Sequence, residues 1–243
     1  MTLLAHCDTK RVEESVVLNA PVIDGTNTWN PVHHSELILS LEKSIHNAGM
    51  TISKRDYSLS ANSMRMFGLW TLDKADSSMA YSIGIRNSMD KSMAIGITAG
   101  TKVFVCDNLA FSGDFIQFRK HTKNVLEELD MLCTNAVHQM THNLKEFADW
   151  HRKLRTYLVI RERAELLTFQ AMNMGVINPS QFRKFYSLYF DENSPYGDRK
   201  DLYGWHEAVT HLLREKNLFS NHARNRGLNR ICNSYMLSYR GFV

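Results

Sequence analysis

Two stretches of the chain interleave aromatic with basic side chains. Binding of single-stranded nucleic acid needs this mixture, because cations neutralise the backbone phosphates and flat rings stack on unpaired bases. Solvated basic helices whose rings belong to a core have the same composition, so both interpretations stay open. The residues are Trp150, Arg152, Lys153, Arg155 and Tyr157 in the first stretch, and Arg224, Arg226, Arg230, Tyr235 and Tyr239 in the second.

A polar loop that begins at Arg86 is a second candidate site. It joins two cations, Arg86 and Lys91, to the carboxylate of Asp90 at the end of an apolar strand. If Asp107 and Asn108 lie at the same end of the sheet, these groups could bind a phosphate or another ligand. The simpler interpretation is a solvated hairpin turn in which Asp90 bonds to the backbone.

The histidines and cysteines indicate no metal site and no cofactor. His138 and His142 lie four residues apart and could share one face of a helix, but no third ligand is indicated. His206 and His211 are five residues apart, which is poor ligand spacing on a helix. Cys106 could meet a histidine in space and act as a nucleophile, although its place after a short apolar strand favours an inert buried thiol. We therefore assign no catalytic residue.

Short strands are expected to position the polar loop. Residues 81–86 alternate apolar and polar side chains, which is typical of a half-buried strand, and a turn is expected at 99–101. Strands that follow one another with short turns favour antiparallel pairing. Residues 16–18 could add a further short strand. The five predicted strands are residues 51–58, 64–72, 81–86, 94–98 and 103–105.

Helical periodicity dominates the rest of the chain. No Pro or Gly occurs between Phe115 and Met174, and the spacing predicts a helix of about 30 residues that begins after Asp114 or after His121. The other predicted helices are residues 35–48, 156–174, 179–190, 202–215 and 220–239. The fold class is therefore α+β, a small antiparallel sheet followed by a long helix and a C-terminal helical region. Residues 1–114 form the mainly β half and 115–243 the helical half of one structural unit.

Composition limits the class of protein. The 243 residues are 44% apolar and 22% charged, which indicates a globular chain, and the net charge of +4 permits an anionic partner. Residues 216–243 contain five Lys and Arg residues and no Asp or Glu. This charge pattern fits either a solvated helix face or a surface that binds phosphates. Four dispersed cysteines without a CxxC pair suggest free thiols in a reducing cytoplasm. No apolar run approaches the length of a membrane span.

A series of short motifs resembles a known family. An Arg-x-Ser-x-Asp turn at 86–90 is followed by Val-Cys-Asp-Asn at 105–108, by the start of a long helix at His121, and by Tyr-Gly-Trp-His-Glu-Ala-Val-Thr at 203–210. Over roughly residues 60–230 this order resembles the phage- and plasmid-type proteins grouped as domain of unknown function 932. Glu207 stands where that family usually has Asn. The matching positions are Cys106, Asn108, Ala208 and Thr210.

The resemblance implies a protein of a phage, prophage or plasmid that works in a bacterial cytoplasm. Such proteins serve replication, recombination or the blocking of host defences. A helix, a small antiparallel sheet and a long helix are also loosely similar to single-strand annealing proteins, which would imply a homo-oligomer.

Three functions are therefore to be compared. The first is binding of nucleic acid, single-stranded DNA by preference, in recombination or replication. The second is sequestration of a host defence or replication protein through an apolar, methionine-rich surface. The third is an enzyme with a site at Arg86, Asp90, Asp107 and Asn108. The residues expected to contact nucleic acid are Arg86, Lys91, Trp150, Arg152, Arg155, Arg224, Arg226, Arg230 and Tyr235.

Overall fold

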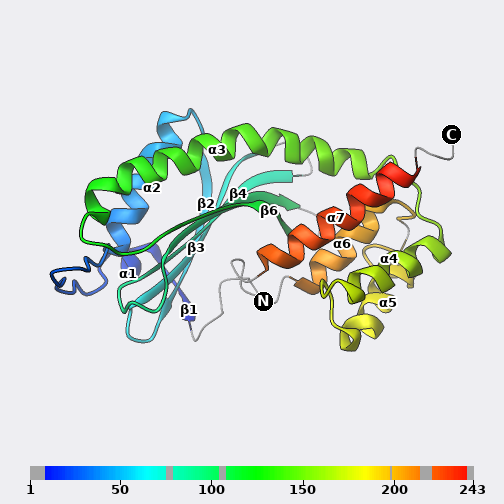
Figure 1. Cartoon of the computed structure of the whole chain (residues 1–243), viewed down its shortest axis with the longest axis horizontal. Coiled ribbons are helices and arrows are strands. Elements are labelled where there is room, and N and C mark those ends of the chain that lie inside the picture. The colour runs from blue at the N-terminus through cyan, green and yellow to red at the C-terminus, as the bar shows by residue number, and fades with distance from the viewer. Residues whose placement is uncertain (1–8, 75–78, 104–107, 198, 214–220, 240–243) are drawn as a thin grey trace.

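The computed structural model describes residues 9–74, 79–103, 108–197, 199–213 and 221–239 (Figure 1). Within them, one antiparallel sheet has six strands in the order β1-β2-β3-β4-β5-β6, so every strand pairs with its neighbours in the chain. This is the α+β fold that the sequence predicts, with six strands where five were expected. The strands are β1 (Thr9–Val12), β2 (Ile52–Ser60), β3 (Arg65–Lys74), β4 (Met79–Ser88), β5 (Ile95–Val103) and β6 (Asn108–Arg119).

Two helices cover one face of the sheet. α2 (His34–Asn47) and α3 (Val125–Leu154) contact each other, and α3 runs along the top of the view in Figure 1. The apolar side chains of α2, such as Leu37 and Leu41, are fully buried against the sheet residues Tyr57, Trp70 and Ile83. Burial of this face provides the first hydrophobic core.

The start of α2 differs from the prediction by two residues. His33, rather than Ser35, is the N-cap, because its Nδ1 accepts a hydrogen bond from the Ser35 backbone N–H. Glu36 completes a capping box, since its carboxylate accepts a hydrogen bond from the His33 backbone N–H at 2.8 Å. Two reciprocal bonds therefore fix where the chain enters the helix.

The C-terminal helices form a second core. Its fully buried members include Leu154 at the end of α3, Phe185 and Trp205. α3 therefore takes part in both cores, and its 30 residues span about 45 Å. The remaining helices are α1 (Glu14–Leu18), α4 (Arg161–Asn173), the 3-10 helix η1 (Pro179–Gln181), α5 (Phe182–Phe190), α6 (Leu202–Leu213) and α7 (His222–Tyr239).

Several predicted boundaries are wrong. The expected turn at 99–101 lies inside β5, where the pairing with β6 is irregular between Thr98 and Gly100. Residues 16–18 belong to helix α1, and the short charged strand β1 was not predicted. The long helix begins at Val125, so a start after Asp114 is excluded, because residues 108–119 pair with β5 as a strand. Of the predicted strand 103–105, Val103 ends β5 and the rest lies outside the described residues.

Gly68 allows the central strands to approach each other. It pairs with Tyr57 on β2 and with Ile85 on β4, and a Cβ atom at this position would lie 2.6 Å from Ile85 Cγ1 and 3.2 Å from Tyr57 Cδ1. The Gly68→Ala substitution should lower the free energy of unfolding by about 1–3 kcal/mol, because the Ile85 side chain must move in a close-packed core. Urea denaturation measures the effect.

A double-mutant cycle isolates that contact. In an Ile85→Ala background the clashing atoms are absent, so the Gly68→Ala substitution should cost much less than in the native chain. Equal costs in the two backgrounds would contradict the proposed clash.

Candidate functional site

The residues expected to contact nucleic acid lie in two groups. Arg86 and Lys91 are at the end of the sheet where β4 ends and β5 begins, which we call the β4–β5 end. The others lie near the C-terminus of α3 or along α7. Val125 at the start of α3 and Trp150 near its end are separated by about 37 Å of helix. The two groups are therefore distinct surfaces rather than one site.

Both cations of the β4–β5 end lie over aromatic rings. The guanidinium carbon of Arg86 is 4.7 Å from the centroid of the Phe118 ring, and Lys91 Nζ is 4.7 Å from that of Trp29. Arg86 is half-buried, whereas Lys91 is exposed. The ring faces attract these charges and hold the two side chains at defined positions.

Asp90 serves the turn itself. Its Oδ1 accepts hydrogen bonds from the Ser92 backbone N–H and from Ser88 Oγ, and Arg65 lies nearby with Nε 3.7 Å from Oδ2. Partial burial acts to raise the pKa of Asp90, but the bonds from Ser92 and Ser88, together with Arg65, outweigh it and lower the pKa below its usual value. This is the hairpin turn of the simpler interpretation.

The structure does not bring Asn108 to this turn, as the predicted ligand site required. Arg86 pairs with Gly96 near the start of β5, whereas Asn108 pairs with Val103 at the other end of that strand. Seven strand residues separate these levels by about 23 Å. Asp107 and Cys106 lie outside the described residues. The enzyme hypothesis that rested on this juxtaposition therefore loses its structural basis.

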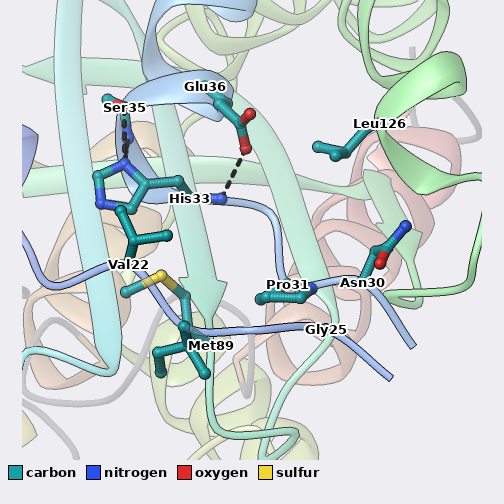
Figure 2. A pocket seen from close by; sticks show the side chains of 10 residues that line it. Val22, Gly25, Asn30, Pro31, His33, Ser35, Glu36, Met89 and Leu126 are labelled. Carbon is teal, nitrogen blue, oxygen red and sulfur yellow. Dashed lines mark hydrogen bonds between the residues drawn. The ribbon is translucent and has the colours of Figure 1, made fainter. Parts of the chain in front are cut away.

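A surface pocket lies beside the β4–β5 end, and no motif in the sequence indicated it. Figure 2 shows its lining, which includes Met89 from the turn, Leu126 from α3 and Pro31 from the loop before α2. The volume of the pocket is about 440 Å³. The polar groups at its edge bond to one another, since the His33 N–H donates to Glu36 and His33 Nδ1 lies 2.6 Å from Ser35 Oγ. The pocket is thus largely apolar, with the Glu36 carboxylate engaged in the cap.

A buried polar cluster next to the pocket joins the loop to the sheet. Asn87 is fully buried, and its Nδ2 donates to the Val32 carbonyl at 2.8 Å and lies 3.0 Å from His34 Nδ1. Because the Asn87 amide donates to Nδ1, the proton of the His34 ring is on Nε2. Nε2 lies 3.0 Å from the Ser63 carbonyl oxygen, to which it donates. These bonds require a neutral His34, and protonation would break one of them.

The basic groups of α3 are already partly engaged. Trp150 stacks on Phe147 with the ring centroids 5.7 Å apart, and its Nε1 donates to Asn233 Oδ1 at 2.7 Å. Arg152 forms an ion pair with Asp149. The Arg155 guanidinium carbon lies 4.4 Å from the centroid of the Tyr203 ring. Arg152 and Arg155 remain exposed, whereas Trp150 is half-buried and presents only part of its ring.

The three arginines of α7 do not lie on one face. Arg226 and Arg230 are exposed and one helical turn apart, and Asn233 continues their face. Arg224 is half-buried on the side of Leu228, and its Nη1 is buried with no hydrogen-bond partner among the described residues. The helical step of about 100° per residue explains the division.

Tyr235 has a structural contact. Its hydroxyl donates to the Leu158 carbonyl at 2.6 Å and so connects α7 to the segment after α3. Burial, with Tyr239 nearby, raises the pKa of the Tyr235 hydroxyl, which therefore stays a donor. The half-buried ring has less surface for stacking than the sequence suggested.

A second polar cluster lies where α3 meets α6. His151 of α3 meets His206 and Glu207 of α6, and all three are at most 1% exposed. The two imidazole centroids are 4.8 Å apart, and His206 Nδ1 lies 3.4 Å from Glu207 Oε1. Sequence spacing missed this cluster because its members come from distant segments. The available signal was a His-Glu pair inside a mostly apolar helix.

Protonation of His34 should make folding stability depend on pH. Burial, aided by the neighbouring His33 and His121 and opposed by the bond to Ser63, lowers the pKa of His34 from 6.5 to about 4. Between these values the unfolded chain binds a proton that the folded chain excludes, so stability falls as the pH falls. The contribution of His34 should be about 2 kcal/mol less at pH 5 than at pH 7.

Denaturation of a His34→Gln variant at both pH values tests this. The difference in free energy of unfolding between pH 7 and pH 5 should shrink relative to the native chain. An exposed histidine provides the control, because His138→Gln should leave that difference unchanged. An undiminished difference in His34→Gln would show that His34 does not carry the effect.

Comparisons with known protein families, with curated proteins and with solved structures found no match to this chain. Among the described residues, no helix combines the length and apolar character needed to cross a bilayer.

Proposed function

We propose that this protein binds nucleic acid, single-stranded DNA by preference, through a surface made of the end of α3 and the exposed face of α7. We call it the α3–α7 surface. Its cations are Arg152 and Lys153 on α3, Arg155 directly after α3, and Arg226 and Arg230 on α7.

The contact between Trp150 and Asn233 is the observation that carries this proposal. Asn233 belongs to the α7 face that presents Arg226 and Arg230, so its bond to Trp150 brings the two helices of the surface together. α7 contains no acidic residue, and Arg226 and Arg230 are both exposed on it. Cations along two adjacent helices provide the sequence-independent part of nucleic-acid affinity.

The resemblance to domain of unknown function 932 adds a context. It implies a role in recombination or replication of a mobile element within a bacterial cytoplasm. An annealing role would further require several copies of the chain along one strand. The half-buried Trp150 and Tyr235 limit stacking, so we assign most of the affinity to phosphate contacts.

Fluorescence anisotropy with labelled single-stranded DNA tests the surface. Replacing Arg226 and Arg230 together by Ala should weaken binding, and the slope of log affinity against log salt should become shallower by about 1.4 if each arginine contacts one phosphate. Duplex DNA of the same length should bind more weakly than the single strand.

A charge-matched control distinguishes this surface from general basicity. Arg183 and Lys184 are exposed on α5, on the far side of the helical region from α3 in Figure 1. Replacing both by Ala removes the same charge and should change affinity much less. An equal loss in the two variants, or no loss in Arg226→Ala/Arg230→Ala, would refute the assignment.

A second candidate function is binding of a host protein. Several large apolar side chains of α4 and α5 are exposed, among them Leu166, Phe169, Phe182 and Tyr186. Exposed apolar surface of this kind is typical of protein interfaces.

Capture from bacterial lysate in the presence of nuclease separates the two functions. A protein partner retained through α4 and α5 should survive nuclease treatment and be lost on replacing Phe169 and Phe182 by Ser. A partner bridged by nucleic acid should disappear with nuclease and depend on Arg226 and Arg230 instead.

A further inference from the structure

The polar cluster under the α3–α7 surface contains the donor atoms of a metal site. His151 projects from α3, and His206 and Glu207 project from α6. One potential ligand atom from each residue lies within 4.8 Å of the other two. Two imidazoles and one carboxylate form a ligand set that proteins use for Zn²⁺ and for other divalent transition metals.

His151 is the observation that points to a ligand. It is fully buried, and neither of its ring nitrogens has a hydrogen-bond partner among the described residues. A buried imidazole normally satisfies both nitrogens, because each one loses its bonds to water on folding. In a metal site, the ligating nitrogen bonds to the ion and to no protein group. The His151 nitrogen near His206 and Glu207 fits this description.

The protonation state of His151 suits this role. Burial, together with the neighbouring His206 and Arg155, holds the pKa of His151 well below its usual value. The ring is therefore neutral at physiological pH, and a neutral imidazole has the lone pair that a metal binds.

The carboxylate of Glu207 lies beside His206 inside the core. It is 1% exposed, and its Oε1 lies 3.4 Å from His206 Nδ1. Carboxylate oxygen and imidazole nitrogen are both ligands of divalent transition metals. A divalent cation between Glu207, His206 and His151 would engage the carboxylate and both imidazoles.

We propose that His151, His206 and Glu207 bind one divalent transition-metal ion and that the ion ties α3 to α6. Tetrahedral zinc ligands lie about 3.3 Å apart, so small side-chain rotations would close the present separation. Aromatic rings surround the cluster, with Phe147 4.8 Å from His151 and Trp150 5.5 Å from His206 between ring centroids. In these surroundings the ion would stabilise the second core, with one water molecule completing the coordination by its three protein ligands.

This proposal does not depend on binding of nucleic acid. Its test uses the full chain, freed of metal by chelation and titrated with Zn²⁺ alone against a chromophoric competitor. One Zn²⁺ should bind per chain, and a hundredfold excess over Kd should raise the Tm by about 5 °C or more. Replacing Zn²⁺ by Co²⁺ should give the visible absorption of a four-coordinate site with nitrogen and oxygen ligands.

Three variants assign the ligands. His151→Gln and Glu207→Gln each remove one ligand with little change in volume, and each should weaken Zn²⁺ binding by at least tenfold. His138→Gln/His142→Gln removes the exposed pair four residues apart on the same helix and should leave the stoichiometry and the Co²⁺ spectrum unchanged.

The outcomes are distinct. No binding of Zn²⁺ to the native chain at micromolar concentration would overturn the proposal without any variant. Binding that is lost in His138→Gln/His142→Gln and retained in Glu207→Gln would place the ion on the helix surface and overturn it as well. Circular dichroism of each metal-free variant shows that a loss of binding is not a loss of fold.

Discussion

The structure depends on one constraint, which is that α3 must bury residues in two separate cores. Its first half lies on the sheet, where Val125 and Met140 are buried, and Leu154 at its end belongs to the C-terminal core. A helix that is uninterrupted by Pro or Gly transmits its orientation from one core to the other. α6 and α7 also contact β6 directly, so α3 and the last strand together fix the C-terminal core against the sheet.

This arrangement divides the polar chemistry of the chain. At the β4–β5 end, side chains that could contact a ligand are used to hold the turn and the entry to α2, as Asp90 and His33 show. At the other end of α3, exposed arginines lie near the buried cluster of His151, His206 and Glu207. The second end therefore combines an accessible charged surface with a buried imidazole, His151, whose ring nitrogens have no hydrogen-bond partner among the described residues, and it is the better candidate for function.

Hydrophobic periodicity correctly predicted the helices and strands that have a strong apolar stripe. It failed for segments whose secondary structure is decided by pairing with a distant segment. α2, α3 and the strand around Trp70 carried clear signals. Residues 108–119 alternate only in two short runs, 109–112 and 116–119, interrupted by Gly113, and their pairing with β5 makes them one strand. The opposite orientations of Arg224 and Arg226 follow from helix geometry and could have been predicted. The meeting of His151 with His206 could not, because it needs the tertiary contact between α3 and α6.

The order of the strands has a consequence for folding. Each strand pairs with the one made just before it, so the sheet can form through short loops while the chain is being synthesised. Its apolar face, however, is covered in large part by α3, which is made after the last strand. A nascent chain that ends before α3 would thus expose a broad apolar surface, which is covered only once the 30 residues of α3 have been made.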